Sequence, residues 1–241
     1  MNPYHHGKEK CIIANCSGFF GDRFSAAAEM VRGGEIDFLT GDYLAELTMA
    51  ILLRKQLKDP DAGYVSTFLK QMEEIMGECL DRKIRVVTNA GGLNPRGLAG
   101  QIQTVAEKLG LNPTIAFIEG DNLMPRLDDL QESGEAFTHL DKNISLKTAG
   151  VKPISANAYT GGWGIVEALN HGADIVIGGR IADAALVMGP AAWHFGWKQN
   201  DWDRLAGAVV AGHIIECGAQ ATGGNYSFME EVPSFKNIGF P

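Results

Sequence analysis

Short apolar runs that end in glycine-rich turns recur along this chain, and most of these turns lead into a segment with helical spacing. The pattern occurs twice within residues 152–186, where a run ending at Ile154 precedes NAYTGGWG and residues 174–177 precede GGRIAD. We expect each half to form a strand, a turn and a helix, because a short, wholly apolar strand is typical of a sheet covered by helices on both faces. This pattern therefore restricts the fold to the α/β class.

The same alternation of strand and helix continues through the rest of the chain. Four more strands are predicted, at residues 11–14, 36–39, 84–87 and 114–118. Further helices are predicted at residues 24–31, 63–80, 98–109 and 202–215, with another that ends at Leu57. Six strands alternating with helices favour a mostly parallel sheet with helices on both faces, a three-layer, Rossmann-like arrangement. A (β/α) barrel-like fold is the alternative, because further strands could lie in the weakly patterned residues 123–150.

Residues 123–150 are polar and unevenly patterned. We predict that they leave the sheet as an excursion with one short helix, which acts as a lid over the strand ends. The chain stops at KNIGFP, where Ile238 and Phe240 are expected to leave apolar surface partly uncovered. We therefore expect residues 1–241 to form a single α/β domain that is the amino-terminal part of a longer protein.

The composition limits the classes of partner. The 241-residue chain has a net charge of −8, which argues against nucleic acid or an anionic membrane surface as a partner. No apolar run is long enough to span a bilayer, and the first residues lack the apolar core of a signal peptide. The four cysteines, Cys11, Cys16, Cys79 and Cys217, form no C-x-x-C pair, which favours reduced cytosolic thiols. We predict a cytoplasmic homo-oligomer that binds a small molecule.

The turn TNAGGLNPRG after the third predicted strand is a candidate anion site. Gly91 and Gly92 leave backbone N–H groups accessible, and Asn94 occupies the position of a helix N-cap before Pro95. The start of a helix attracts a carboxylate or a phosphate, and Arg96 would add a positive charge. The alternative is a simple capped helix with an exposed arginine. No Walker lysine follows the glycines, so a nucleoside triphosphate loop is not indicated.

The turns of the central stretch supply further candidates for substrate or anion binding, namely Asn157, Gly161, Gly162 and Arg180. Ligands of open α/β sheets and of α/β barrels bind at the carboxyl ends of the strands, where these turns are expected. The GGWG sequence opens a predicted helix, but it lacks the G-x-G-x-x-G spacing and no acidic residue ends the next strand. A dinucleotide site is therefore only weakly indicated.

Acidic residues occur repeatedly in or just after the predicted strand-end turns. The set comprises Asp22, Asp42, Glu46, Asp121 and Asp183. Carboxylates that converge at one edge suit general acid–base catalysis or a Mg²⁺-type oxygen site, so Asp42, Asp121 and Asp183 are the candidate catalytic residues. Any single one could instead be a helix cap or a solvated charge. Cys217 could be a nucleophile only beside a base, and a buried inert thiol is the alternative.

Six blocks of sequence, in order along the chain, form a signature. They are NCSGFFGDR, GGEIDFLTGDYLAELTMAIL, TNAGGLNPRG, ANAYTGGWGIVEAL, GADIVIGGRIADAAL and AGHIIECGAQATGGNY. Together they resemble the acyclic terpene utilisation protein AtuA family, and they cover nearly the whole chain. Members of that family are typically longer, so the resemblance implies that this sequence is the amino-terminal portion. The family is associated with bacterial catabolism of acyclic terpenes such as citronellol and geraniol, whose intermediates are branched acyl-CoA thioesters.

The resemblance and the strand-end residues together predict a catabolic enzyme that acts on a branched carboxylated small molecule or its CoA thioester, in a lyase- or hydratase-type step. The alternative is a non-catalytic ligand-binding or accessory subunit of a catabolic complex. A CoA thioester is a candidate substrate and a divalent metal a candidate cofactor. The resemblance brings no established catalytic residues, so the predicted site depends on turn position.

Overall fold

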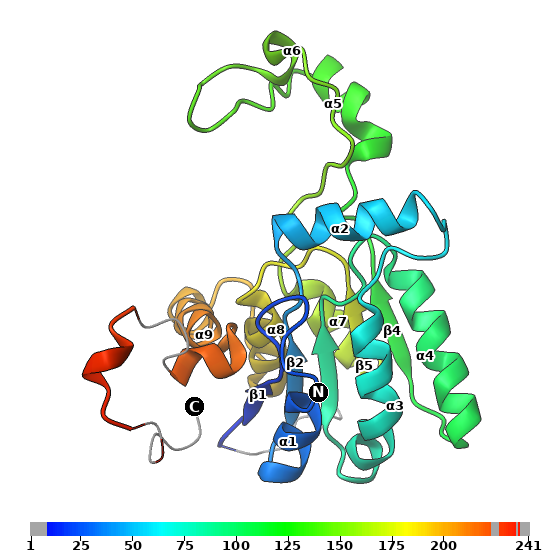
Figure 1. The fold of residues 1–241 in the computed structure, drawn as a ribbon, viewed down its shortest axis with the longest axis vertical. Coiled ribbons are helices and arrows are strands. Elements are labelled where there is room, and N and C mark those ends of the chain that lie inside the picture. The colour runs from blue at the N-terminus through cyan, green and yellow to red at the C-terminus, as the bar shows by residue number, and fades with distance from the viewer. Residues whose placement is uncertain (1–8, 223–226, 235, 237–241) are drawn as a thin grey trace.

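The computed structural model describes residues 9–222, 227–234 and 236. Five strands form one sheet in the order β1-β2-β3-β5-β4, and every pair of neighbours is parallel. The strands are β1 (Ile13–Asn15), β2 (Phe38–Gly41), β3 (Arg85–Thr88), β4 (Ile115–Ile118) and β5 (Ile175–Gly178). The predicted α/β fold with a mostly parallel sheet is thereby confirmed (Figure 1).

Helices connect the strands and cover both faces of the sheet (Figure 1). The α-helices are α1 (Ala26–Gly33), α2 (Glu46–Gln56), α3 (Ser66–Asp81), α4 (Pro95–Leu109), α5 (Leu127–Glu132), α6 (Leu146–Ala149), α7 (Trp163–Asn170), α8 (Ala185–Phe195) and α9 (Trp202–Ile215). The described residues also form three short 3-10 helices, η1 (Met124–Arg126), η2 (Gly218–Thr222) and η3 (Met229–Glu231).

The two faces of the sheet carry separate apolar cores. On one face Leu39, Val86 and Ile177 share a core with side chains of α1, α3 and α4. On the opposite face Phe38 and Val176 share a core with side chains of α7 and α8. Neighbouring residues of a strand point to opposite faces, so a strand that serves both cores is apolar at every position. This explains the continuous apolar runs in the sequence.

The strand order places a topological switch between β3 and β5. The helix that follows β3, α4, packs on the first face, whereas the helix that follows β5, α8, packs on the opposite face. In open α/β sheets a crevice opens at such a point, and ligands bind there. The carboxyl ends of all five strands lie at one edge because all neighbours are parallel. The ANAYTGG turn joins this edge through a bridge between Thr160 and Ile181, so the turns predicted to line one edge do so.

One predicted strand is wrong. Residues 151–155 form no strand, and Ile154 is 75% exposed. Pro153 interrupts the apolar run because it lacks the N–H group that pairing in a sheet requires. The chain returns to the strand-end edge through isolated bridges instead, first between Asn157 and Asn122 and then between Thr160 and Ile181. The sheet formed by the described residues therefore has five strands and not six.

Residues 123–150 leave the sheet as predicted, but they contain two short α-helices, α5 and α6, and the 3-10 helix η1 where one helix was expected. In Figure 1 this segment projects from the body of the molecule beyond α2. Its function as a lid stays a prediction. The expectation for Ile238 and Phe240 falls outside the described residues. Within the described parts of the chain, no helix combines the length and apolar character that crossing a membrane requires.

The predicted N-cap of α4 is confirmed and gives a test of this part of the fold. The side chain of Asn94 accepts a hydrogen bond from the N–H of Gly97 at 2.9 Å and donates to the carbonyl of Asp61 at 3.0 Å. Asn94→Ala removes both bonds, so we expect the free energy of unfolding to fall by about 1–2 kcal/mol in chemical denaturation. Gln101→Ala, at an exposed position of the same helix, is the control and should stay within about 0.5 kcal/mol of the wild type. Equal losses in both variants would contradict the capping role.

Candidate functional site

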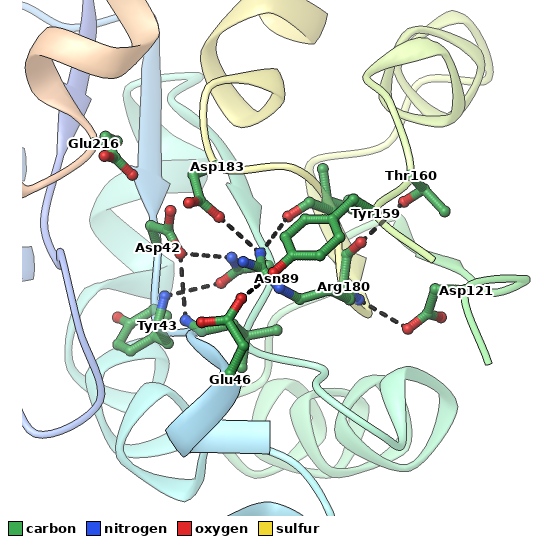
Figure 2. A network of polar contacts seen from close by, with 12 residues as sticks. Asp42, Tyr43, Glu46, Asn89, Asp121, Tyr159, Thr160, Arg180, Asp183 and Glu216 are labelled. Carbon is green, nitrogen blue, oxygen red and sulfur yellow. Dashed lines mark hydrogen bonds and ion pairs between the residues drawn. The ribbon is translucent and has the colours of Figure 1, made fainter. Parts of the chain in front are cut away.

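The candidate site lies at the carboxyl edge of the sheet, beside the switch between β3 and β5 (Figure 2). Three neighbouring strands, β2, β3 and β5, each lead into a turn with a buried polar side chain, and these are Asp42, Asn89 and Arg180. The end of α9 contributes Glu216, and the turn before α7 contributes Tyr159. Segments far apart in the sequence therefore meet at one place.

Asp42 is the most enclosed acid of the site, with 2% of its surface exposed. Its Oδ1 accepts hydrogen bonds from Asn89 Nδ2 at 2.6 Å and from the backbone N–H of Leu44 at 3.2 Å. Asn89 is itself held in place, because its Oδ1 accepts from the N–H of Tyr43 at 2.8 Å. The other oxygen of Asp42, Oδ2, is buried and receives no hydrogen bond from the described residues. One oxygen of this carboxylate is therefore fixed, and the other lacks a donor.

Arg180 is a buried cation with 4% of its surface exposed. Its Nη1 donates hydrogen bonds to Asp183 Oδ1 at 2.7 Å and to the carbonyl of Ile181 at 2.9 Å. The guanidinium also lies over the ring of Tyr159, 4.1 Å from the ring centroid. A planar guanidinium can stack on an aromatic ring and bond a carboxylate at the same time, which a lysine cannot do as well. The turn GGRIAD thus brings two predicted site residues, Arg180 and Asp183, into direct contact.

Glu216 reaches the site because the end of α9 is tied to the turn after β1. Asn15 Nδ2 donates to the backbone carbonyls of Glu216 at 2.6 Å and of Ile215 at 3.0 Å. Gly18 allows the close approach, since a Cβ at this position would lie 2.5 Å from the carbonyl oxygen of Cys217. These contacts join two segments about 200 residues apart, and they place the Glu216 carboxylate opposite Asp42 (Figure 2).

The three carboxylates of Asp42, Asp183 and Glu216 form a cluster, in which one oxygen from each lies within 4.8 Å of the others. Burial and the negative charge of Asp183 raise the pKa of Asp42 to about 7, although the hydrogen bond from Asn89 lowers it. Burial of like charges in one place is costly to folding, and such arrangements are typical of functional sites. We refer to Asp42, Asp183 and Glu216 below as the carboxylate cluster.

Tyr159 and Glu46 form the rim of the site. Tyr159 is 54% exposed, and its hydroxyl donates a hydrogen bond to Glu46 Oε1 in the first turn of α2. This hydrogen bond lowers the pKa of Glu46 and raises the pKa of Tyr159. Glu46 is therefore ionised and Tyr159 protonated at neutral pH. The pair links α2 to the turn before α7 and holds the tyrosine ring over Arg180.

Asp121, the third predicted catalytic residue, lies at the same edge but outside the carboxylate cluster. Its Oδ2 accepts hydrogen bonds from Asn157 Nδ2 and from the backbone N–H of Arg180, both at 2.9 Å. Gly179 makes room for this carboxylate, because a Cβ there would lie 2.5 Å from Asp121 Oδ1. Asp121 and Asn157 thus position the turn that carries Arg180. Their roles in catalysis and in substrate binding stay predictions.

The predicted anion site at TNAGG is largely accounted for by packing. A Cβ on Gly91 would lie 2.5 Å from the carbonyl oxygen of Gly178, and Gly92 has a φ of +54°. The N–H of Gly92 donates to the carbonyl of Asn89 at 3.1 Å, so it is not available to a ligand. Arg96 is mostly exposed and pairs with Glu119 at 3.1 Å. The loop therefore serves helix capping and close packing, and anion binding by Gly91, Gly92, Asn94 and Arg96 stays a prediction.

The remaining predicted residues divide between packing and open surface. A Cβ on Gly162 would lie 3.0 Å from the backbone nitrogen of Gly189, so this glycine lets α7 approach α8, whereas Gly161 borders open space. Asp22 accepts a hydrogen bond from the N–H of Gly18 at 2.9 Å and stabilises its own turn.

Burial, followed by the charge of Glu216, raises the pKa of the Cys217 thiol. A neutral thiol at physiological pH agrees with the inert alternative for Cys217.

Four residues of the site were not predicted from the sequence, namely Asn15, Asn89, Tyr159 and Glu216. A signal existed for Asn15 and Asn89, because each lies at the end of an apolar run, as Asp42 does. Tyr159 lies in the ANAYTGG turn, where Asn157, Gly161 and Gly162 were the predicted residues. For Glu216 the sequence holds no comparable signal, since its place depends on a contact with Asn15 that only the folded chain forms.

The fold and the site define an open parallel α/β protein with a polar cluster at the topological switch of its sheet. A family model described as acyclic terpene utilisation family protein AtuA matches residues 11–241. The chain belongs to this family, as the six sequence blocks predicted. Comparison with the curated proteins and with the solved structures gives no match.

The position of Asp121 leads to a prediction about stability. Asp121→Ala leaves the buried N–H of Arg180 and the amide of Asn157 without their acceptor. We expect the free energy of unfolding to fall by about 2–4 kcal/mol in chemical denaturation, because these hydrogen bonds involve a charged acceptor. Asp128→Ala, at an exposed position of α5, should change it by less than about 0.5 kcal/mol. A loss for Asp121→Ala no larger than that of the control would show that the carboxylate does not position the turn.

Proposed function

We propose that this protein is a catabolic enzyme that acts on a branched, carboxylated small molecule or on its CoA thioester, in a lyase- or hydratase-type step. The observation that carries the proposal is the convergence of the carboxylate cluster and Arg180 at the switch of the sheet. Separate parts of the chain contribute these groups, at the edge where open α/β sheets bind their ligands. Membership in the acyclic terpene utilisation family supports a branched substrate.

The proposed reaction type follows from what a carboxylate cluster can do. A hydratase or lyase step moves a proton to or from a carbon near an activated carbonyl group, so it needs a fixed proton acceptor beside the substrate. The carboxylate cluster supplies such acceptors, either directly or through a water molecule held between them. Arg180 fixes Asp183, and Asn89 fixes Asp42, so these carboxylates are oriented before a substrate arrives.

The surroundings of the cluster support a substrate with a polar end and an apolar chain. Tyr159 and Leu47 are each more than half exposed, and Leu47 follows Glu46, the partner of Tyr159, in α2. An apolar branched chain would lie against these rim residues. The carboxylate or thioester end would point toward the positive charge of Arg180. A CoA thioester as substrate, the cytoplasmic location and the homo-oligomer stay predictions.

Turnover measured with purified protein tests the proposal. The protein is incubated with branched acyl-CoA thioesters and with the matching free acids, and products of water addition or bond cleavage are detected by mass spectrometry. We expect turnover by the wild type and a loss of about 100-fold or more in kcat for Asp183→Asn, because this variant removes a carboxylate from the cluster. Asp203→Asn, at an exposed position of α9, should keep the wild-type kcat.

Two outcomes would contradict this assignment. If Asp183→Asn turned over substrate as fast as Asp203→Asn, the carboxylate cluster would not be the reaction centre. If no thioester or acid were converted, but one of them raised the melting temperature, the protein would be a non-catalytic ligand-binding or accessory subunit.

A further inference from the structure

We propose that the carboxylate cluster, Asp42, Asp183 and Glu216, binds one divalent cation of the Mg²⁺, Mn²⁺ or Ca²⁺ class. The inference rests on the proposed function for its catalytic meaning, because the cation would lie in the proposed reaction centre. The binding itself can be tested without a substrate. Three features of the cluster support it, and these are the spacing of its oxygens, the buried oxygen of Asp42 and the balance of charge.

The spacing and chemistry of the cluster suit a hard cation. One oxygen from each carboxylate lies within 4.8 Å of the others, so all three can reach a common point. Oxygens on opposite sides of a bound cation are about 4 Å apart around Mg²⁺ and about 5 Å apart around Ca²⁺. Carboxylate oxygens are the ligands that these cations prefer, whereas thiolates select softer metals.

The second feature is the buried oxygen of Asp42. Oδ1 accepts two hydrogen bonds, whereas Oδ2 is buried without a donor among the described residues. Buried carboxylate oxygens in folded proteins are nearly always paired, so a lone one calls for a physical explanation. Figure 2 shows this oxygen on the side that faces Glu216 and Asp183. A cation at the centre of the cluster would supply the partner that the protein does not.

The third feature is the balance of charge. Three carboxylates meet, and one oxygen of Asp183 is paired with Arg180 at 2.7 Å. His213 lies 4.0 Å from Glu216 and is largely exposed, so it compensates little of the negative charge. Asn89 and Asn15 hold Asp42 and the backbone of Glu216 in place, as residues behind the ligands do in metal sites. A divalent cation would offset the repulsion and could polarise a carbonyl oxygen of the substrate.

Cation binding by the full chain is the experiment that tests this inference. Chelator-treated protein is titrated with Mg²⁺, Mn²⁺ and Ca²⁺ separately, by calorimetry for all three and by electron paramagnetic resonance for Mn²⁺. We expect saturable binding of one cation per chain. The melting temperature should rise by about 5–10 °C at a cation concentration near 100 times Kd, because the cation binds the folded chain and not the unfolded one.

Variants of the ligands separate the proposed site from other acidic groups. Asp42→Asn keeps an oxygen to accept from Asn89 and places an amide donor next to Glu216, so the cation-free protein should melt no lower than the wild type. Asp42→Asn and Glu216→Gln should each weaken cation binding by about tenfold or more. Asp203→Asn removes an exposed acid of α9 outside the site and should leave the affinity unchanged.

The outcomes distinguish this inference from the proposed function. Absence of saturable binding to all three cations, or unchanged affinity in both Asp42→Asn and Glu216→Gln, would overturn the cation site. Substrate turnover that persists in a chelator would overturn the catalytic meaning of the cation, while leaving the enzyme proposal intact. Cation binding that depends on Asp42 and Glu216 would support the site even if no turnover were found, and only the proposed enzyme function would then fail.

Discussion

The parallel pairing of β3 with β5 is the constraint on which the site depends. It brings Val87 beside Val176 and inserts β5 between β3 and β4, so that the helices after β3 and β5 leave toward opposite faces. The close packing at the strand ends results from this arrangement, because a Cβ on Gly91 would lie only 2.5 Å from the carbonyl oxygen of Gly178. Any side chain at position 91 would push the two strand ends apart. The position of the candidate site and the close packing of the strand ends are therefore consequences of one strand order.

The carboxylate cluster lowers the stability of the folded chain, whereas the close packing of the strand ends raises it. A buried carboxylate loses the hydration it has in the unfolded chain, and neighbouring negative charges add to that cost. The protein offsets part of it with two buried hydrogen-bond donors on Asp42 and with Arg180 on Asp183. Groups that only stabilised the fold would not need to face one another in this way. A bound ligand would offset the remaining cost of burying these negative charges. A ligand that binds only the folded chain adds its binding free energy to the stability of the fold.

Much of the fold could be predicted from the sequence, and the errors have physical causes. The apolar runs of β3 and β5 are recognisable because both faces of these strands are buried. The predictions at residues 11–14 and 36–39 stop short of β1 and β2, whose last residues include Asn15 and Thr40. These polar residues pair within the sheet while their side chains bond each other, so polarity alone was a misleading sign of a turn. Glu216 could not be predicted at all, since nothing local marks a residue whose neighbours lie some 200 positions away.

Asp42 and Asp121 show why turn position alone cannot assign a role. Both are buried acids in turns that follow strands, and the sequence marked them equally. In the folded chain one oxygen of each acid accepts two hydrogen bonds, from Asn157 and the N–H of Arg180 on Asp121 and from Asn89 and the N–H of Leu44 on Asp42. The second oxygen of Asp42 is buried without a donor among the described residues, and it belongs to a cluster with Asp183 and Glu216. A buried carboxylate oxygen without a donor has capacity left for a ligand. What separates the two residues is therefore the surroundings of the second oxygen, and these exist only after the strands have been ordered in the sheet.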